Sequence, residues 1–309
     1  MMRSVFAHVP RGQLARASAV AIVLAPLPAV ARSDVAAQPP DGSVLQTTVK
    51  VDGQQRSYRL FHPRLRPGER YAGTVVMLHG GGRRESGASI ASSVGFDAQA
   101  AAGRLIAIYP DARGGRFHAG HCCGSRAARG DDVRFVVRLL DLVQRRYRVD
   151  ARRTFAAGFS NGAFLAYRLA CQQSGRFLGV ASVGGTEVLR RCQPDRPVSV
   201  LHIHGRDDRR VRFAGGILGR PWIPGALELA RRWRVRNHCP RGRTQTQRSP
   251  ELLISRTPGC RHATQVQLVA LEDFGHAWPS AGAPYGEPSA YNASAEIGRF
   301  FAGLRRRPR

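Results

Sequence analysis

The chain has 309 residues, 43% of them hydrophobic, and a mean hydropathy of -0.28. These values indicate a globular protein with an ample core, long enough for one large α/β domain or two small ones. The formal net charge of +27 is almost entirely arginine, since Lys50 is the only lysine, and it is spread along the whole chain. Because the arginines neither gather in one segment nor alternate with aromatic residues, we expect no nucleic-acid partner. A surface that binds another polyanion remains the alternative.

The N-terminus has the pattern of a secretory signal peptide. Basic residues up to Arg16 precede an apolar run, Ala17–Leu27, and Ala29-Val30-Ala31 offers a cleavage site between small residues. The run is too short to span a bilayer, so we expect no stable membrane insertion once the signal is cleaved. The predicted signal peptide is 1–31, followed by a linker at 32–42. This predicts a secreted or periplasmic protein, with an uncleaved membrane anchor as the alternative.

Six cysteines follow the predicted cleavage site, and an even number in an oxidising compartment predicts three disulfides. They are Cys122, Cys123, Cys171, Cys192, Cys239 and Cys260. The first pair to join is Cys239 and Cys260, which flank one polar segment rich in Arg and Pro. A metal site is the competing interpretation, but the spacing lacks C-x-x-C pairs, and we expect none.

Strand and helix patterns alternate along most of the chain. Apolar alternation at 44–51 and 56–62, joined by Asp52-Gly53, predicts a hairpin of antiparallel edge strands. The other predicted strands are 74–78, 105–109, 154–159, 178–183, 198–203 and finally 265–271. The predicted helices are 89–102, 131–147, 227–235 and 294–304, together with a helical stretch that follows 158–162 and runs up to Ala170, and a long loop is expected at 114–124. The alternation predicts an α/β fold with a mostly parallel sheet covered by helices on both faces. We expect one domain at 43–304 and a solvated basic tail at 305–309.

One strand ends in a pattern typical of a nucleophilic serine. The run Thr154–Phe159 leads into Gly158-Phe159-Ser160-Asn161-Gly162, and an apolar stretch at helical spacing follows. The glycines of G-x-S-x-G are needed because side chains on either flank of the sharp turn would collide. The sequence therefore predicts Ser160 at the apex of a strand–turn–helix. The alternative is a glycine-rich turn that happens to contain a serine.

A serine nucleophile needs a base, and the base needs an acid that fixes its tautomer. In open α/β sheets such residues follow the carboxyl ends of strands. Asp208 follows the strand at 198–203, and His276 follows the strand at 265–271, so the chain order is Ser, Asp, His. We predict His276 as the general base and Asp208 as the acid. Asp207 is the rival acid, and the rival base His204 more plausibly has a structural or supporting role.

A glycine-rich loop, His79-Gly80-Gly81-Gly82, follows the strand at 74–78. Consecutive glycines allow backbone N–H groups to approach a ligand, so the N–H groups of Gly81 and Asn161 are the predicted oxyanion donors. A phosphate-binding loop is disfavoured because no Gly-Lys-Ser/Thr follows. Asp131-Asp132 is expected to cap the helix that it begins rather than to perform acid/base chemistry.

Six motifs occur in an order typical of one family: HGGG (79–82), CCG (122–124), DDV-F (131–135), GFSNGA (158–163), HG--D (204–208) and GHAWP (275–279). Over nearly the whole mature chain they resemble the secreted polyhydroxybutyrate depolymerase/feruloyl esterase group of α/β-hydrolases, which includes acetylxylan-type esterases. The resemblance implies an α/β-hydrolase fold, Ser160, Asp208 and His276 as the catalytic residues, disulfides and no cofactor. It also places His79 and Trp278, members of two of these motifs, at the expected substrate-binding site.

Two departures from the family bear on the substrate. Phe117-His118 stands where the family often has Trp-Asn, in a loop expected near the pocket, and Arg209-Arg210 replaces small and apolar residues after the acid. We expect a monomeric carboxylic-ester hydrolase that acts on small or oligomeric esters: feruloyl or acetyl esters of plant polysaccharide, or short hydroxyalkanoate oligomers. The alternatives are a serine peptidase on the same scaffold and a non-catalytic exported binding protein.

Overall fold

The computed structural model describes residues 40–122, 131–219, 221–282 and 285–305. The predicted signal peptide, the linker up to residue 39 and residues 306–309 of the predicted tail lie outside the described residues. Among the helices of these described ranges, none is both long and apolar enough to cross a membrane.

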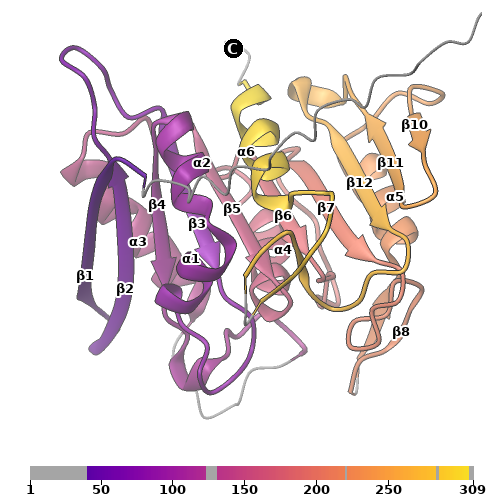
Figure 1. Ribbon diagram of the computed structural model, residues 1–309, viewed down its shortest axis with the longest axis horizontal. Coiled ribbons are helices and arrows are strands. Elements are labelled where there is room, and N and C mark those ends of the chain that lie inside the picture. The colour runs from indigo at the N-terminus through magenta and orange to yellow at the C-terminus, as the bar shows by residue number, and fades with distance from the viewer. Residues whose placement is uncertain (1–39, 123–130, 220, 283–284, 306–309) are drawn as a thin grey trace, which may run out of the picture. The chain divides into compact units, whose positions relative to one another are not determined.

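Ten of the described strands form one sheet, in the order β1-β2-β4-β3-β5-β6-β7-β12-β11-β10 (Figure 1). The six central strands from β4 to β12 are parallel, and antiparallel strands extend the sheet at both ends. Their bounds are β1 Gly42–Val51, β2 Gln54–Pro63, β3 Gly73–Leu78, β4 Leu105–Pro110, β5 Thr154–Phe159, β6 Gly179–Val183, β7 Ser199–Gly205, β10 Gln245–Arg248, β11 Leu252–Thr257 and β12 Val266–Leu271. The predicted α/β fold with a mostly parallel sheet is confirmed.

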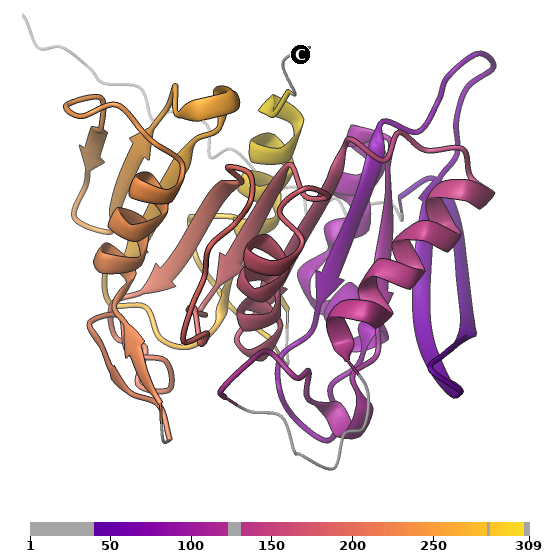
Figure 2. The ribbon, with the colours of Figure 1, turned by 180° about the vertical axis from the view of Figure 1, so that it is seen from behind.

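Helices cover both faces of this sheet, as Figures 1 and 2 show from opposite sides. The helices α3, α4 and α5 pack in one apolar cluster, and α1, α2 and α6 pack in the other. Their bounds are α1 Gly87–Val94, α2 Phe96–Gly103, α3 Asp132–Arg146, α4 Asn161–Gln172, α5 Ala226–Arg236 and α6 Ala293–Gly303. The central strands read as continuous apolar runs because side chains on both faces are buried; every residue of β3, β4 and β5 is buried.

Two short-range sequence patterns in the first half of the chain, a hairpin turn and a helix cap, have the structures that were predicted for them. The β1–β2 hairpin turns at Asp52-Gly53, both with positive φ, although only β1 lies at the edge of the sheet. The carboxylate of Asp131 accepts a hydrogen bond from the N–H of Val133 and caps α3, as predicted. Asp132, in contrast, is buried and forms an ion pair of 2.6 Å with Arg56, which was not predicted.

One predicted element is wrong, and several strands were not predicted. The single helix predicted at 89–102 is two helices, because Gly95 takes a left-handed conformation (φ 61°) between α1 and α2. The polar segment between Cys239 and Cys260 contains the antiparallel strands β10 and β11; all four residues of β10 are exposed, whereas β11 alternates half-buried and buried residues. Short strand pairs were also missed, namely β8 (Gly215–Ile217) with β9 (Trp222–Pro224) and β13 (Trp278–Pro279) with β14 (Gly286–Glu287).

Two disulfides are described, Cys171–Cys192 and Cys239–Cys260, and the second is the pair that the sequence predicted first. Cys122 is disulfide-bonded as well, and Cys123 lies outside the described residues. The Cys239–Cys260 bond closes the segment that carries β10 and β11, so it ties the residues after α5 to those before β12.

Candidate active site

The predicted strand–turn–helix is present at the carboxyl end of β5. Ser160 has φ 50° and ψ -114°, a backbone conformation that L-residues rarely adopt and that costs about 1–3 kcal/mol. The flanking glycines have a steric reason: a Cβ on Gly158 would lie 2.5 Å from the carbonyl carbon of Gly162, and a Cβ on Gly162 would lie 2.2 Å from the carbonyl oxygen of Leu78. The turn therefore presents Ser160 at the carboxyl end of the central strand β5 and leaves no room for larger flanking residues.

We expect Gly158→Ala to distort this turn, since the new Cβ meets backbone that cannot rotate away. The expected cost is about 2–3 kcal/mol of unfolding free energy, or a Tm lower by roughly 5–10 °C. Thermal unfolding measures it. Gly303→Ala is the matched control, because a Cβ on Gly303 meets nothing within 4 Å. Equal Tm values for the two variants would contradict the steric account.

Three side chains from different strand ends form one hydrogen-bonded line. The Nε2 atom of His276 lies 3.0 Å from the Oγ of Ser160, and its Nδ1 lies 2.7 Å from the Oδ2 of Asp208. Ser160 and His276 are partly exposed, whereas the Asp208 side chain has no exposed area. The structure thus brings together the three residues that the sequence singled out, with the serine at the solvent side and the acid in the interior.

The carboxylate of Asp208 is held by several donors. Its Oδ1 accepts hydrogen bonds from the backbone N–H groups of Arg210 (2.9 Å) and Val211 (2.8 Å), and His204 lies 3.2 Å from its Oδ2. Burial alone would raise the pKa of Asp208, but the hydrogen bonds from His204, His276 and Val211 outweigh burial and hold that pKa well below its usual range. Asp208 therefore stays ionised beside His276.

The structure decides between the neighbouring aspartates. Asp207 is exposed, and its backbone N–H donates to the carbonyl of Phe274. The side chains of Arg209 and Arg210 are exposed as well. Of the pair, Asp208 is the carboxylate that meets His276.

The glycine-rich loop lies beside the first turn of α4. A Cβ on Gly81 would be 3.2 Å from the Cβ of Asn161, so the two residues named as oxyanion donors are neighbours. As the first residue of α4, Asn161 has a backbone N–H outside the helical hydrogen-bond pattern, at the positive end of the helix dipole. Its side chain is occupied elsewhere: Oδ1 accepts from the N–H of Phe117 (2.7 Å) and Nδ2 donates to the carbonyl of Phe117 (3.1 Å).

The expectation that His79 and Trp278 contact substrate is corrected. Both side chains are fully buried. The His79 ring is held by the carbonyl of Gly80 (2.7 Å) and the N–H of Ala112 (3.0 Å), and Trp278 donates from Nε1 to the hydroxyl of Ser294 (3.1 Å). His79 therefore supports the glycine-rich loop from the protein core, and Trp278 anchors the segment after His276 in the core.

The loop at Phe117 also differs from the expectation that it lines a pocket. The Phe117 side chain is fully buried and packs against the tilted ring of His79, with 4.6 Å between the ring centroids, while His118 is half-buried and hydrogen-bonded to Arg168. The loop affects the site indirectly, because the Phe117 backbone holds the Asn161 side chain. In the sequence, the apolar character of Phe117 fits a pocket wall and a core position equally well.

Sequence reasoning missed the polar residues behind the acid. His202 and Tyr167 are buried and hydrogen-bonded to each other at 2.8 Å, and His202 lies 3.0 Å from His204. The alternation His202-x-His204 in a buried strand is the signal that could have found them, since residues i and i+2 face the same side of a sheet.

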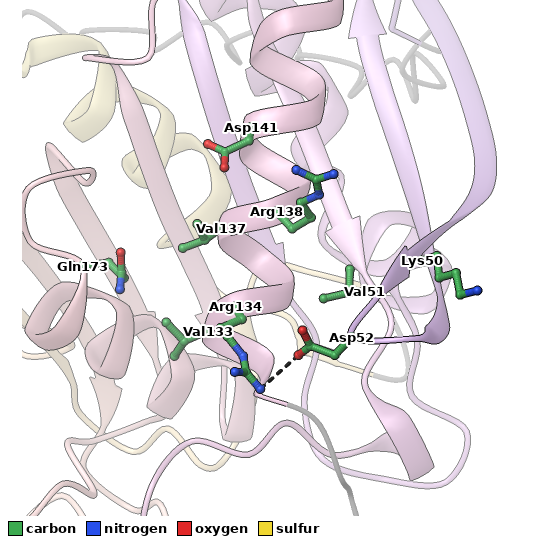
Figure 3. A pocket seen from close by; sticks show the side chains of 9 residues that line it. All are labelled: Lys50, Val51, Asp52, Val133, Arg134, Val137, Arg138, Asp141 and Gln173. Atoms are coloured by element: carbon green, nitrogen blue, oxygen red, sulfur yellow. Dashed lines mark ion pairs between the residues drawn. The ribbon is translucent and has the colours of Figure 1, made fainter.

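A cavity of about 430 Å³ lies away from the triad, between the tip of the β1–β2 hairpin and α3 (Figure 3). Its lining includes Lys50, Arg138 and Asp141, and an ion pair of 3.0 Å joins Asp52 to Arg134 across it. No triad residue lines it.

Cys171, Glu187 and Cys192 lie together, but they do not offer a metal site. The two sulfurs are joined in a disulfide, and Glu187 forms a bidentate ion pair with Arg236. The sulfurs are therefore not thiolates, and the carboxylate already has a partner.

A mostly parallel sheet with a serine on a strained strand–helix turn, and an acid and a histidine after later strands, is the architecture of the α/β-hydrolases. The family model described as esterase PHB depolymerase matches residues 56–210, just over half of the chain. The chain belongs to this family, which places it among the carboxylic-ester hydrolases.

The chain is similar in sequence to curated esterases and similar in fold to a solved esterase structure. The chain is 29% identical over 217 residues to probable feruloyl esterase C of Aspergillus niger, covering 70% of this chain and 72% of the relative. It is 24% identical over 155 residues to the bifunctional acetylxylan esterase/xylanase XynS20E of Neocallimastix patriciarum, covering 48% of this chain but only 22% of that relative. The acetyl xylan esterase from Aspergillus awamori superposes with a TM-score of 0.58 at 15% identity, covering 84% of this chain and 99% of that one, which shows the shared fold.

Proposed function

We propose that the chain is a secreted or periplasmic serine esterase in which Ser160, His276 and Asp208 form the catalytic triad. The observation that supports this most directly is the continuous line of hydrogen bonds from Ser160 through His276 to Asp208. The described disulfides support an oxidising compartment, where such bonds persist.

In the proposed reaction the Oγ of Ser160 attacks the ester carbonyl carbon while the Nε2 of His276 takes its proton. The carbonyl oxygen becomes an oxyanion that accepts hydrogen bonds from the backbone N–H groups of Gly81 and Asn161. As the tetrahedral intermediate collapses, His276 returns the proton to the departing alcohol, which leaves an acyl-enzyme. Water, deprotonated by His276, then attacks the acyl carbon and releases the acid and free Ser160.

The proposed substrates are feruloyl or acetyl esters of plant polysaccharide, or short hydroxyalkanoate oligomers. The names of the relatives favour the first two, since they include feruloyl and acetylxylan esterases. Ser160 is partly exposed at the end of the sheet, which suits a small acyl group joined to a larger alcohol that extends into solvent.

The test is hydrolysis of p-nitrophenyl acetate and methyl ferulate by the oxidised mature protein, followed by inactivation with a phenylmethylsulfonyl or fluorophosphonate reagent. We expect turnover of at least one ester, stoichiometric loss of activity, and a mass increase on the peptide that contains Ser160. Turnover of both esters with the label on another serine would refute the triad. Absence of ester turnover together with cleavage of peptide amides would favour a peptidase, and absence of both, with no labelling, would favour a binding protein.

A further inference from the structure

A line of buried polar side chains continues behind the acid, away from Ser160. His202 and His204 alternate in β7 and face the same side of the sheet as Val200, toward the cluster that contains α4 and α5. Tyr167 comes from α4 on that side and meets His202. All three side chains are nearly or fully buried, at 2% exposure or less.

The partners determine which atoms carry protons. The Nε2 atom of His204 lies 2.7 Å from the carbonyl oxygen of Val211 and 3.2 Å from the Oδ2 of Asp208. Both are acceptors when Asp208 is ionised, so Nε2 carries the proton and donates to them. In neutral His204 the Nδ1 atom is then an acceptor, and the Nε2 of His202 donates to it across 3.0 Å.

The same reasoning extends one residue further. With its proton on Nε2, His202 has an acceptor at Nδ1, and the hydroxyl of Tyr167 donates to it across 2.8 Å. Burial lowers the pKa of His202 well below its usual value, which keeps this ring neutral. One arrangement of protons therefore satisfies every link from Tyr167 to Asp208, and each donor points toward the carboxylate.

We propose that Tyr167, His202 and His204 form a positioning relay that fixes the carboxylate of Asp208 for His276. The terminal torsion of an aspartate has a broad energy profile, so its hydrogen bonds set the carboxylate plane. The N–H of Val211 donates to Oδ1 while the carbonyl of Val211 accepts from His204, so the turn after β7 is clamped to the relay from both sides. This inference rests on the triad proposed above.

The first test compares two substitutions of His204. Gln places an amide N–H near the position of Nε2 and keeps a donor toward Asp208, whereas Leu keeps bulk and removes it. We expect His204→Leu to lower kcat by about one to two orders of magnitude, the range for a displaced catalytic group, with KM changed less than about twofold. His204→Gln should keep kcat within about threefold of wild type. Folded variants with equal kcat would overturn the relay.

The second test needs no ester turnover. The His276 Nδ1–H proton, seen at low field by NMR, reports its hydrogen bond to Asp208. We expect Tyr167→Phe to move this resonance, because His202 loses the donor that holds its tautomer. The matched control is Tyr109→Phe, which removes a buried hydroxyl that donates to Asp97 (2.5 Å) in the other apolar cluster.

The two readouts separate the relay from the proposed function. A shift in Tyr167→Phe but not in Tyr109→Phe supports the relay even if the right ester has not been found. An unchanged resonance in both variants overturns it, and so does an equal shift in both, which would indicate a general effect of losing a buried hydroxyl. If His204→Leu does not fold, the tyrosine pair alone decides.

Discussion

Replacing Ser160 by alanine should lower kcat on any ester that the wild type hydrolyses by a factor on the order of a million. The reason is that Ser160 Oγ is the atom within 3.0 Å of the His276 Nε2, so its loss leaves the base without a nucleophile to activate. The fold should persist, because the backbone conformation at this position does not depend on the hydroxyl. We expect the free energy of unfolding to change by less than about 1 kcal/mol.

Steady-state kinetics and urea unfolding of Ser160→Ala provide the measurements. Ser92→Ala is the control, since Ser92 is an exposed serine of α1 whose hydroxyl bonds to the carbonyl of Ser89. It should retain the wild-type kcat. Activity in folded Ser160→Ala within a factor of about a hundred of wild type would exclude Ser160 as the nucleophile.

Asp208→Asn should lower kcat by about ten-thousandfold while leaving the fold intact. An amide at this position can donate to the Nδ1 of His276, which drives the proton of the neutral ring to Nε2. The ring then faces Ser160 with an N–H instead of a lone pair and cannot accept the serine proton. Asp207→Asn is the matched control, because the exposed neighbour changes charge by the same amount without meeting His276.

The difference in stability between wild type and Asp208→Asn should also depend on pH. The folded-state pKa of Asp208 is depressed, so this carboxylate contributes stability above its unfolded pKa of about 3.9. That contribution is lost progressively as the pH falls toward the folded pKa. The Tm difference between wild type and Asp208→Asn should therefore narrow as the pH is lowered below about 4. A difference that widens on acidification would contradict the assigned pKa direction.

Most of the sheet was predictable because its central strands are buried on both faces. Continuous apolar runs such as Val75–Leu78 have the length of a strand and are too short for a typical helix. The edge was less predictable: β10 has four exposed residues, and hydrogen bonds to β11 rather than a hydrophobic pattern define it. The break between α1 and α2 depends on one left-handed glycine, Gly95, which helical periodicity does not register.

The roles of some candidate site residues could likewise be predicted from the sequence, and the roles of others could not. Ser160, Asp208 and His276 could be predicted because each sits at a strand end in a short motif, where the sheet topology leaves few arrangements. His79 and Trp278 belong to equally recognisable motifs, yet both are buried. A residue can belong to a motif because of packing as well as because of contact with a substrate. His79 packs beneath the glycine-rich loop and Trp278 packs against α6, so both belong to a motif for a packing reason.

The amino-acid sequence by itself indicated the central strands and most of the helices, the serine turn and the three triad candidates, because these depend on local steric and apolar patterns. It also singled out Cys239 and Cys260 as the first cysteines to pair, since they flank one polar segment. Only the tertiary structure decided which aspartate meets His276, and that Tyr167, His202 and His204 stand behind it. Those contacts join α4, β7 and the turns after β7 and β12, which are distant in sequence. Their distances and proton positions depend on how the helices pack against the sheet.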